Sequence, residues 1–176
     1  YEEALSVQEA DLALERRLRV PEEDMLVAQS SLANTYDALG RHEDAARILR
    51  DVYAGTLKLY GEEHRDSLLA ANNYTATLFD MNRLKEAKAL MHKTIPVAIR
   101  ILGGTDRLTL KMRSLYAKAL YTDDDATLDD LREAVTTFED VGRIAQRVLG
   151  GAHPLVSDTQ RSLEVMRVGL AARLAA

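Results

Sequence analysis

The chain has 176 residues, of which 47% are hydrophobic and 29% charged, so it is long enough and apolar enough to bury a globular core. It contains no cysteine, which excludes disulfides, thiolate metal sites and cysteine nucleophiles, and we expect a reducing, cytoplasmic compartment. The net charge of −5 argues against nucleic acid as a partner, and the lack of an apolar run of roughly 20 residues argues against a membrane span.

The first expected helix covers residues 1–18, where Val7, Leu14 and Leu18 recur near helical spacing. Pro21 follows, and a proline just beyond a helical run indicates that the helix has ended, because its ring cannot continue the hydrogen-bond ladder. Asp24 is then placed to cap the next helix by accepting from its free amides.

A pair of helices is predicted within residues 24–65. Apolar residues spaced three and four apart indicate one helix over 25–39 and a second over 43–60. Gly40 lies between them and supplies the left-handed residue that a helix end often requires.

The segment 66–107 repeats this plan, with helices predicted over 67–81 and 84–102. Asn82 takes the place of the glycine, as the usual second choice for a left-handed cap. Pro96 falls inside the later helix, where it removes a backbone donor, and a kink is expected there.

The third segment, 108–154, keeps the two-helix pattern with five extra residues, which fall at the turn Thr122–Thr127. The last segment, 155–176, is expected to form one helix that opens a fourth unit or caps the stack. The prediction is an all-α protein with about eight antiparallel helices and no strand.

The segments 24–65 and 66–107 are two copies of one 42-residue repeat. Laid over each other they share Asp24/Asp66, Leu26/Leu68, Ala28/Ala70, Thr35/Thr77, Arg41/Arg83, Ala45/Ala87, Gly61/Gly103 and Arg65/Arg107. A fixed period of this length predicts a solenoid. Residues 1–176 are therefore predicted to form a single repeat domain, in which 1–23 is the second helix of a preceding repeat. The chain starts at Tyr1 rather than methionine, and we expect it to be a piece of a longer protein.

These units resemble the tetratricopeptide-repeat superfamily, in particular the 42-residue repeats of kinesin-light-chain-like proteins. The helix-pairing positions of that family are occupied by Leu32, Tyr36, Gly40 and Ala45, by Tyr74, Asn82 and Ala87, and by Tyr116 and Ala134. The turn Gly61-Glu62-Glu63-His64 and the turn Gly150-Gly151-Ala152-His153-Pro154 resemble the family's Gly-x-x-His-Pro. Asp106 departs from this pattern because it stands where histidine is expected.

The resemblance implies a right-handed α-α superhelix whose first helices line a concave groove that binds a peptide or protein segment. By register, the candidate groove residues are Asn34, Asn72, Asn73, Phe79, Lys111, Ser114, Lys118 and Tyr121. Asn34, Asn73 and Lys111 match three positions of the carboxylate-clamp pattern of chaperone-binding members, which implies an acidic peptide or a terminal carboxylate as ligand. Ser30 and Leu115 stand where that pattern places cations. Alternatively, Asn72 and Asn73 shape the packing and the two lysines are solvated.

The predicted function is a non-catalytic protein–protein interaction scaffold. The alternative is the sensor or regulatory repeat arm of a larger multidomain enzyme, such as a nucleotide-driven switch. The sequence gives no oligomeric state and identifies no partner beyond a protein or peptide segment.

No motif predicts a catalytic residue, a metal site or a cofactor. His42, His64, His92 and His153 are far apart and lack the HExxH spacing. A role in ordering the start of the next helix is the simpler expectation for His64 and His153. The acidic run at Asp123 lacks the glycine and glutamate of a calcium loop, so it is expected to be a solvated turn whose last acids favour the following helix.

Overall fold

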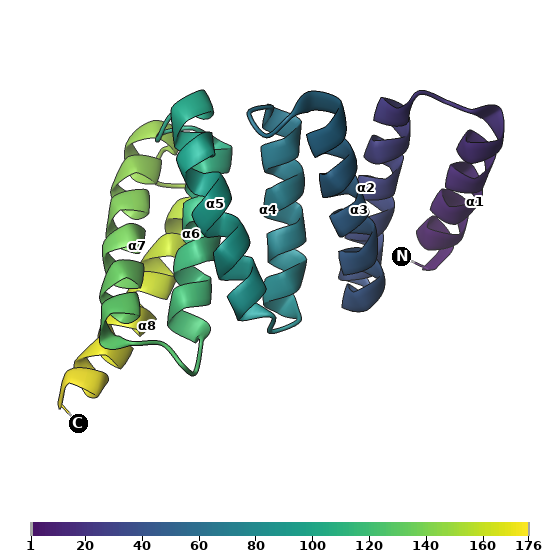
Figure 1. Cartoon of the computed structure of the whole chain (residues 1–176). Coiled ribbons are helices and arrows are strands. Elements are labelled where there is room, and N and C mark those ends of the chain that lie inside the picture. The colour runs from purple at the N-terminus through teal and green to yellow at the C-terminus, as the bar shows by residue number, and fades with distance from the viewer. Residues whose placement is uncertain (1, 176) are drawn as a thin grey trace. The chain divides into compact units, whose positions relative to one another are not determined.

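The computed structural model describes residues 2–175, which form eight helices and no strand; Tyr1 and Ala176 lie outside the described residues. Figure 1 shows the helices as successive antiparallel rods. Their bounds are α1 Glu2–Leu18, α2 Glu22–Ala38, α3 His42–Tyr60, α4 Arg65–Asp80, α5 Leu84–Leu102, α6 Arg107–Thr122, α7 Leu128–Leu149 and α8 Pro154–Ala175. The all-α prediction is confirmed. None of these helices is both long enough and apolar enough to cross a membrane.

The chain divides into two compact units, residues 1–82 (unit 1) and 83–176 (unit 2). In unit 1, α2 packs against α3, α3 against α4, and α1 against α2. In unit 2, α7 packs against both α6 and α8, and α5 packs against α6. Within each unit, successive helices pack against one another, which is the packing expected of stacked helical repeats.

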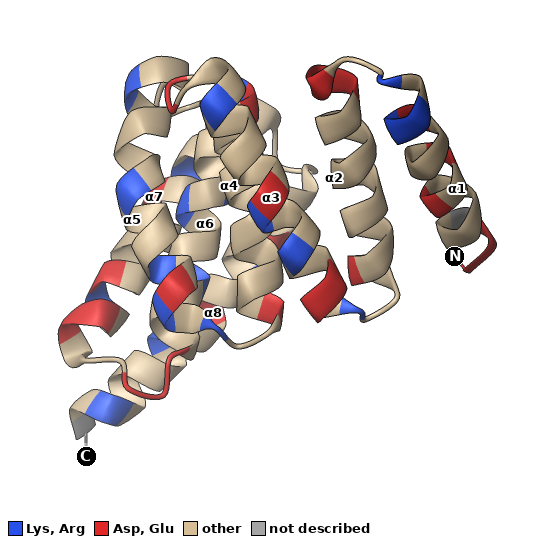
Figure 2. Cartoon of the chain, turned by 45° about the vertical axis from the view of Figure 1, so that its right-hand side comes forward, with Lys and Arg blue, Asp and Glu red and all other residues tan. Residues whose placement is uncertain are grey.

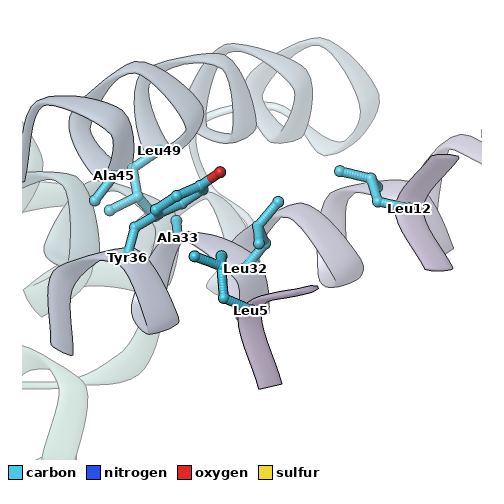
Figure 3. Close-up of a cluster of buried hydrophobic side chains, with 7 residues drawn as sticks. All are labelled: Leu5, Leu12, Leu32, Ala33, Tyr36, Ala45 and Leu49. Carbon is cyan, nitrogen blue, oxygen red and sulfur yellow. The ribbon is translucent and has the colours of Figure 1, made fainter. Parts of the chain in front are cut away.

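The main core of unit 1 joins α1, α2 and α3. Figure 3 shows Tyr36 beside Ala33 and Ala45, two alanines that are fully buried. Small side chains let the backbones of α2 and α3 approach closely. The Tyr36 hydroxyl donates to the Glu9 carboxylate of α1, and the Arg41 guanidinium lies 4.4 Å from the centre of the Tyr36 ring.

Two clusters belong to the core of unit 2. Ala117 of α6 and Ala134 of α7, both fully buried, pack with Phe138. Val141 and Val156 form a second cluster where α7 meets α8. The same pairing of small residues therefore recurs in the third predicted repeat.

The left-handed residues lie where the repeat predicts them. Gly40 has φ +74° and Asn82 has φ +58°, each two residues after the last residue of its helix. Beyond α2, the Gly40 amide donates to Asp37 O and the Arg41 amide to Tyr36 O, each at 2.9 Å. These bonds satisfy carbonyls that the helix leaves free.

The residue that precedes each of α4, α6 and α8 acts as the N-cap of that helix. His64 Nδ1 accepts from the Asp66 amide at 3.3 Å, and His153 Nδ1 accepts from the Leu155 amide at 3.1 Å. Asp106 replaces histidine at the third such turn and accepts from the Leu108 amide at 2.7 Å. The departure from the repeat pattern thus preserves the cap, since aspartate is a preferred N-cap residue.

One local prediction was wrong. The second helix begins at Glu22 with Pro21 as its N-cap, so Asp24 lies inside the first turn and does not cap the helix. On α1 the buried residues are Leu5 and Leu12, whereas Val7, Leu14 and Leu18 are 51–67% exposed. That helix carries two apolar faces, and α2 covers only one of them. Pro96 lies within α5, which continues through it as one helix.

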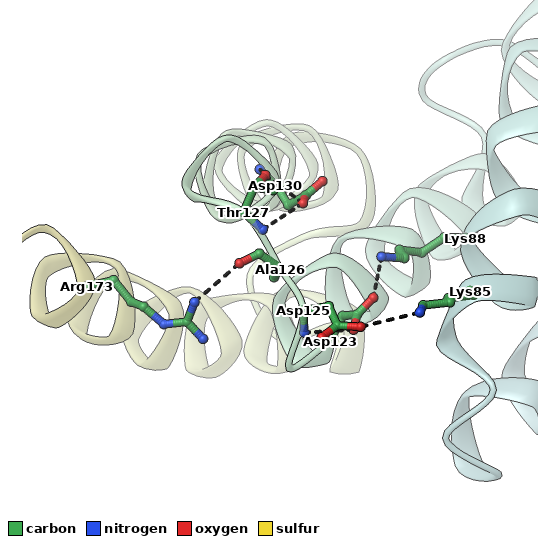
Figure 4. Close-up of polar contacts among 8 residues, drawn as sticks. All are labelled: Lys85, Lys88, Asp123, Asp125, Ala126, Thr127, Asp130 and Arg173. Atoms are coloured by element: carbon green, nitrogen blue, oxygen red, sulfur yellow. Dashed lines mark hydrogen bonds and ion pairs between the residues drawn. The ribbon is translucent and has the colours of Figure 1, made fainter.

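The five-residue insertion is a loop that forms polar contacts with α5 and with α8 (Figure 4). From α5, Lys88 Nζ lies 2.5 Å from an Asp123 carboxylate oxygen and Lys85 Nζ lies 3.3 Å from one of Asp125. From α8, Arg173 donates to the Ala126 carbonyl. Thr127 and Asp130 then form a capping box that starts α7, so the expectation that the acidic turn favours this helix is confirmed.

Candidate binding groove

A groove of about 240 Å³ lies between α2 and α4 of unit 1, with α3 below it. We call it the α2–α4 groove. It is lined by Glu23, Leu26, Val27, Ser30, Ser31, Val52, Thr56, Tyr60, Asp66, Leu69, Ala70 and Asn73. Most of these residues belong to α2 and α4, the first helices of the two full repeats.

The floor of the α2–α4 groove is a small apolar cluster of Leu26, Val52 and Ala70, contributed by α2, α3 and α4. Gly55 of α3 makes this floor possible, because a Cβ there would lie 2.6 Å from Leu26 Cδ2. The floor is therefore part of the fold and does not depend on a ligand.

The walls carry two aliphatic side chains that the fold does not bury. Val27 on α2 is 63% exposed and Leu69 on α4 is 44% exposed. Exposing aliphatic surface on both sides of a hollow is unfavourable in water, and covering it releases roughly 25 cal/mol per Å². The walls can therefore hold an apolar group.

Polar groups lie beside these aliphatic walls. The Ser31 hydroxyl donates to the Val27 carbonyl at 3.1 Å, so it is already engaged within α2. Asn73 Oδ1 accepts from the Asn72 amide at 3.4 Å, while no described residue accepts a hydrogen bond from Asn73 Nδ2. Ser30 and Asn73 can therefore supply hydrogen bonds to a ligand.

One end of the α2–α4 groove is acidic. Glu23 and Asp66 lie in the first turns of α2 and α4, and no lysine or arginine lines the groove. Figure 2 shows the acidic start of α2. Desolvation, and then the Glu23 carboxylate, raise the pKa of Tyr60. This end favours a cation.

The candidate residues of unit 1 divide between the groove and its continuation. Asn73 lines the α2–α4 groove. Asn34 is exposed on α2, one turn beyond Ser30, and Asn72 and Phe79 are half-buried on α4.

The other candidate residues lie in unit 2 on α6. Lys111 is exposed, and no described residue pairs with it. Ser114 is only 5% exposed and its hydroxyl has no hydrogen-bond partner among the described residues, so it offers little surface to a ligand. Lys118 Nζ lies 2.8 Å from an Asp158 carboxylate oxygen, and Tyr121 Oη donates to the Val165 carbonyl at 3.2 Å. Lys111 is thus the α6 candidate left for a partner.

The carboxylate-clamp pattern did not predict the acidic end of the α2–α4 groove. Glu23 and Asp66 stand 43 residues apart, and each reads alone as an acid in the first turn of a helix. The 42-residue period pairs Asp66 with Asp24, the neighbour of Glu23, so it could have placed these acids at one end, because stacked first helices run in the same direction.

Two other hollows have less to offer a ligand. One of about 320 Å³ lies between α1, α2 and α3, where Glu9, Arg16, Arg47 and Asp51 mix both signs of charge around packed core residues. One of about 270 Å³ in unit 2 is lined by residues of α5, α6 and α7, Pro96 among them. Neither lies on the faces that the repeat leaves free of packing.

Among the described residues, one set of three side chains could hold a metal ion: Asp37, His42 and Asp80. Desolvation, and then the negative charge of Asp37, raise the pKa of Asp80.

Residues 25–66 and 67–107 match the tetratricopeptide repeat family model, and both matches begin one residue after the predicted repeats. A crystal structure of a variant of the nearly identical TPR-like repeats of a putative kinesin light chain from Podosopora anserina has a TM-score of 0.80 at 22% identity, covering 99% of this chain and 80% of that one. A second crystal structure of such repeats has a TM-score of 0.78 at 22% identity, covering 99% and 81%.

The crystal structure of BtubC (BKLC) from P. vanneervenii has a TM-score of 0.63 at 15% identity, covering 97% of this chain and 74% of that one. No curated protein matches the sequence. At these identities the likenesses show the fold, and together with the two matched repeats they confirm the predicted repeat architecture.

Proposed function

We propose that this chain, a protein of the tetratricopeptide-repeat superfamily with repeats like those of kinesin light chains, is a non-catalytic scaffold that binds a protein segment in the α2–α4 groove. Repeat folds of this kind support protein–protein interaction. The groove and its ligand are the specific part of the proposal.

The exposed aliphatic pair, Val27 at 63% and Leu69 at 44%, is the observation that carries the proposal. A volume of about 240 Å³ is small beside the 300–1,000 Å³ typical of small-molecule sites. The groove therefore suits one or two side chains of a longer segment that continues past it.

The lining also suggests the chemistry of that segment. An aliphatic side chain would lie between Val27 and Leu69, and its backbone would accept from Asn73 and bond to Ser30. A lysine or arginine one turn away would meet Glu23 and Asp66. We therefore replace the acidic ligand implied by the clamp pattern with an apolar segment that carries a cation.

The test is selection of peptides from a random display library on the intact chain, followed by dissociation constants for the selected peptide. Val27→Glu and Leu69→Glu should each weaken binding at least tenfold, because each puts a carboxylate into an apolar contact. Val168→Glu is the matched control, since Val168 of α8 is 67% exposed and lies outside the groove. Equal losses in all three variants, or no selected peptide, would contradict the proposal.

The charge of the ligand has its own test. Asp66→Asn should weaken the binding of a lysine-containing peptide. It should leave the binding of the lysine-to-norleucine analogue unchanged, because only the lysine carries a charge that the Asp66 carboxylate attracts. The loss should shrink as salt rises. Selected peptides that are consistently acidic would contradict this part of the proposal.

The compartment follows from composition alone. The chain has no cysteine and needs no oxidising environment to fold, and we propose a cytoplasmic location.

A further inference from the structure

The ends of three helices meet at one point of unit 1. Asp37 lies in the last turn of α2, His42 is the first residue of α3, and Asp80 is the last residue of α4. One ligand atom of each side chain lies within 4.8 Å of the other two. His42 Nδ1 lies 2.8 Å from Asp37 Oδ1.

From this geometry we propose that Asp37, His42 and Asp80 form a binding site for a divalent transition-metal ion, Zn²⁺ in particular. An imidazole nitrogen and carboxylate oxygens are ordinary zinc ligands, with bonds of about 2.0–2.2 Å. Ligand atoms around such an ion stand roughly 3–4 Å apart, so the observed spacing needs only small side-chain movements. Three protein ligands leave a fourth position open on the exposed side, next to Asp80.

A second feature prepares Asp37 for this role. Thr77 of α4 is fully buried, and its hydroxyl donates to Asp37 Oδ2 at 2.7 Å. That bond fixes the carboxylate and leaves Oδ1 directed at His42. Hydrogen bonds to the second oxygen of a carboxylate commonly orient it as a ligand.

The charge of the site also calls for a cation. Two of its three side chains are carboxylic acids, and they lie close together. No lysine or arginine among the described residues is in an ion pair with Asp37 or Asp80. A divalent ion would neutralise that charge and join α2 and α3 to α4.

The alternative is that His42 and Asp37 form only the hydrogen bond seen between them, with no metal bound. Binding of Ca²⁺ distinguishes a transition-metal site from a purely acidic one, because Ca²⁺ prefers six to eight oxygen ligands and would bind poorly to a site that includes an imidazole. Both alternatives are accessible to one set of measurements.

The experiment is isothermal titration of the chelator-treated chain with ZnCl₂, MnCl₂ and CaCl₂ at pH 7.5, with thermal unfolding in parallel. We expect one Zn²⁺ per chain, a higher melting temperature with Zn²⁺, and no response to Ca²⁺. Asp80→Asn should abolish the zinc response and still fold, because Asp80 is exposed at a helix end. His42→Gln should abolish it as well.

The control is His92→Gln, which removes an exposed histidine of α5 outside the cluster and should leave zinc binding unchanged. Zinc binding that survives Asp80→Asn, or that falls equally in the His92→Gln control, would overturn the site. A wild-type chain that fails to bind zinc at 100-fold excess, or that binds Ca²⁺ as well as Zn²⁺, would also overturn the site.

Discussion

Replacing Ala45 with leucine should destabilise the chain by about 1–3 kcal/mol. Ala45 of α3 and Ala33 of α2 are both 0% exposed, and they pack in one cluster with Leu32, Tyr36 and Leu49. Leucine adds three carbons at a place with no solvent to receive them. The added atoms must push α3 away from α2 or force neighbouring side chains out of their preferred rotamers.

The control for this substitution lies on the same helix. Ala54 is exposed, so Ala54→Leu carries the same small change in helix propensity without the packing change. Urea unfolding followed by circular dichroism gives both free energies, and their difference isolates the packing cost. If Ala45→Leu costs no more than Ala54→Leu, the close approach of α2 and α3 at this alanine pair is refuted.

Three further predictions concern unit 2. Asp106→Ala removes the N-cap of α6 and should cost about 0.5–2 kcal/mol in urea unfolding; no loss would contradict the cap. Lys88, and then a backbone amide, hold the pKa of Asp123 below its ordinary value, so this ion pair should stabilise the chain at neutral pH. The stability difference between wild type and Lys88→Met should vanish as pH falls through the lowered pKa, below about 4, and a difference independent of pH would exclude the pair. Gly169→Ala brings a Cβ into collision with Tyr121 Oη and should destabilise by about 1–3 kcal/mol, and Tyr121→Phe should recover part of that loss if this contact is the cause.

The features that depend on residues close in sequence could be predicted. Gly40 and Asn82 end their helices in the left-handed region, and His64 and His153 order the helix that follows. Each of these roles is decided by a few neighbouring residues and by the backbone angles that they allow. The repeat period then fixed how many helices to expect.

The features that depend on distant residues could not be predicted in the same way. The spacing of Val7, Leu14 and Leu18 predicted a helix over residues 1–18, but only the packing on α2 shows that Leu5 and Leu12 are its buried residues. Ser114 was placed on a free surface by register, yet it is buried. Register gives the direction of a side chain, whereas burial depends on the size of the residues that oppose it.

Clusters of side chains from different helices cannot be predicted from the spacing of residues in the sequence. His42 lies five residues after Asp37 and 38 before Asp80, which matches no metal-binding motif. The prediction of no metal site rested on the four histidines alone, which are far apart and lack the HExxH spacing. The stacking of α4 on the α2–α3 pair brings these residues together. A search by repeat register would have placed Asp37 and Asp80 at corresponding helix ends.

The most direct measurement is a methyl NMR titration of the intact chain with the peptide selected from the display library. The methyl signals of Val27 and Leu69 should shift on binding, and those of Val165 and Val168 on α8 should not move. Shifts confined to unit 2, or to the outer faces of α1 and α3, would contradict binding in the α2–α4 groove.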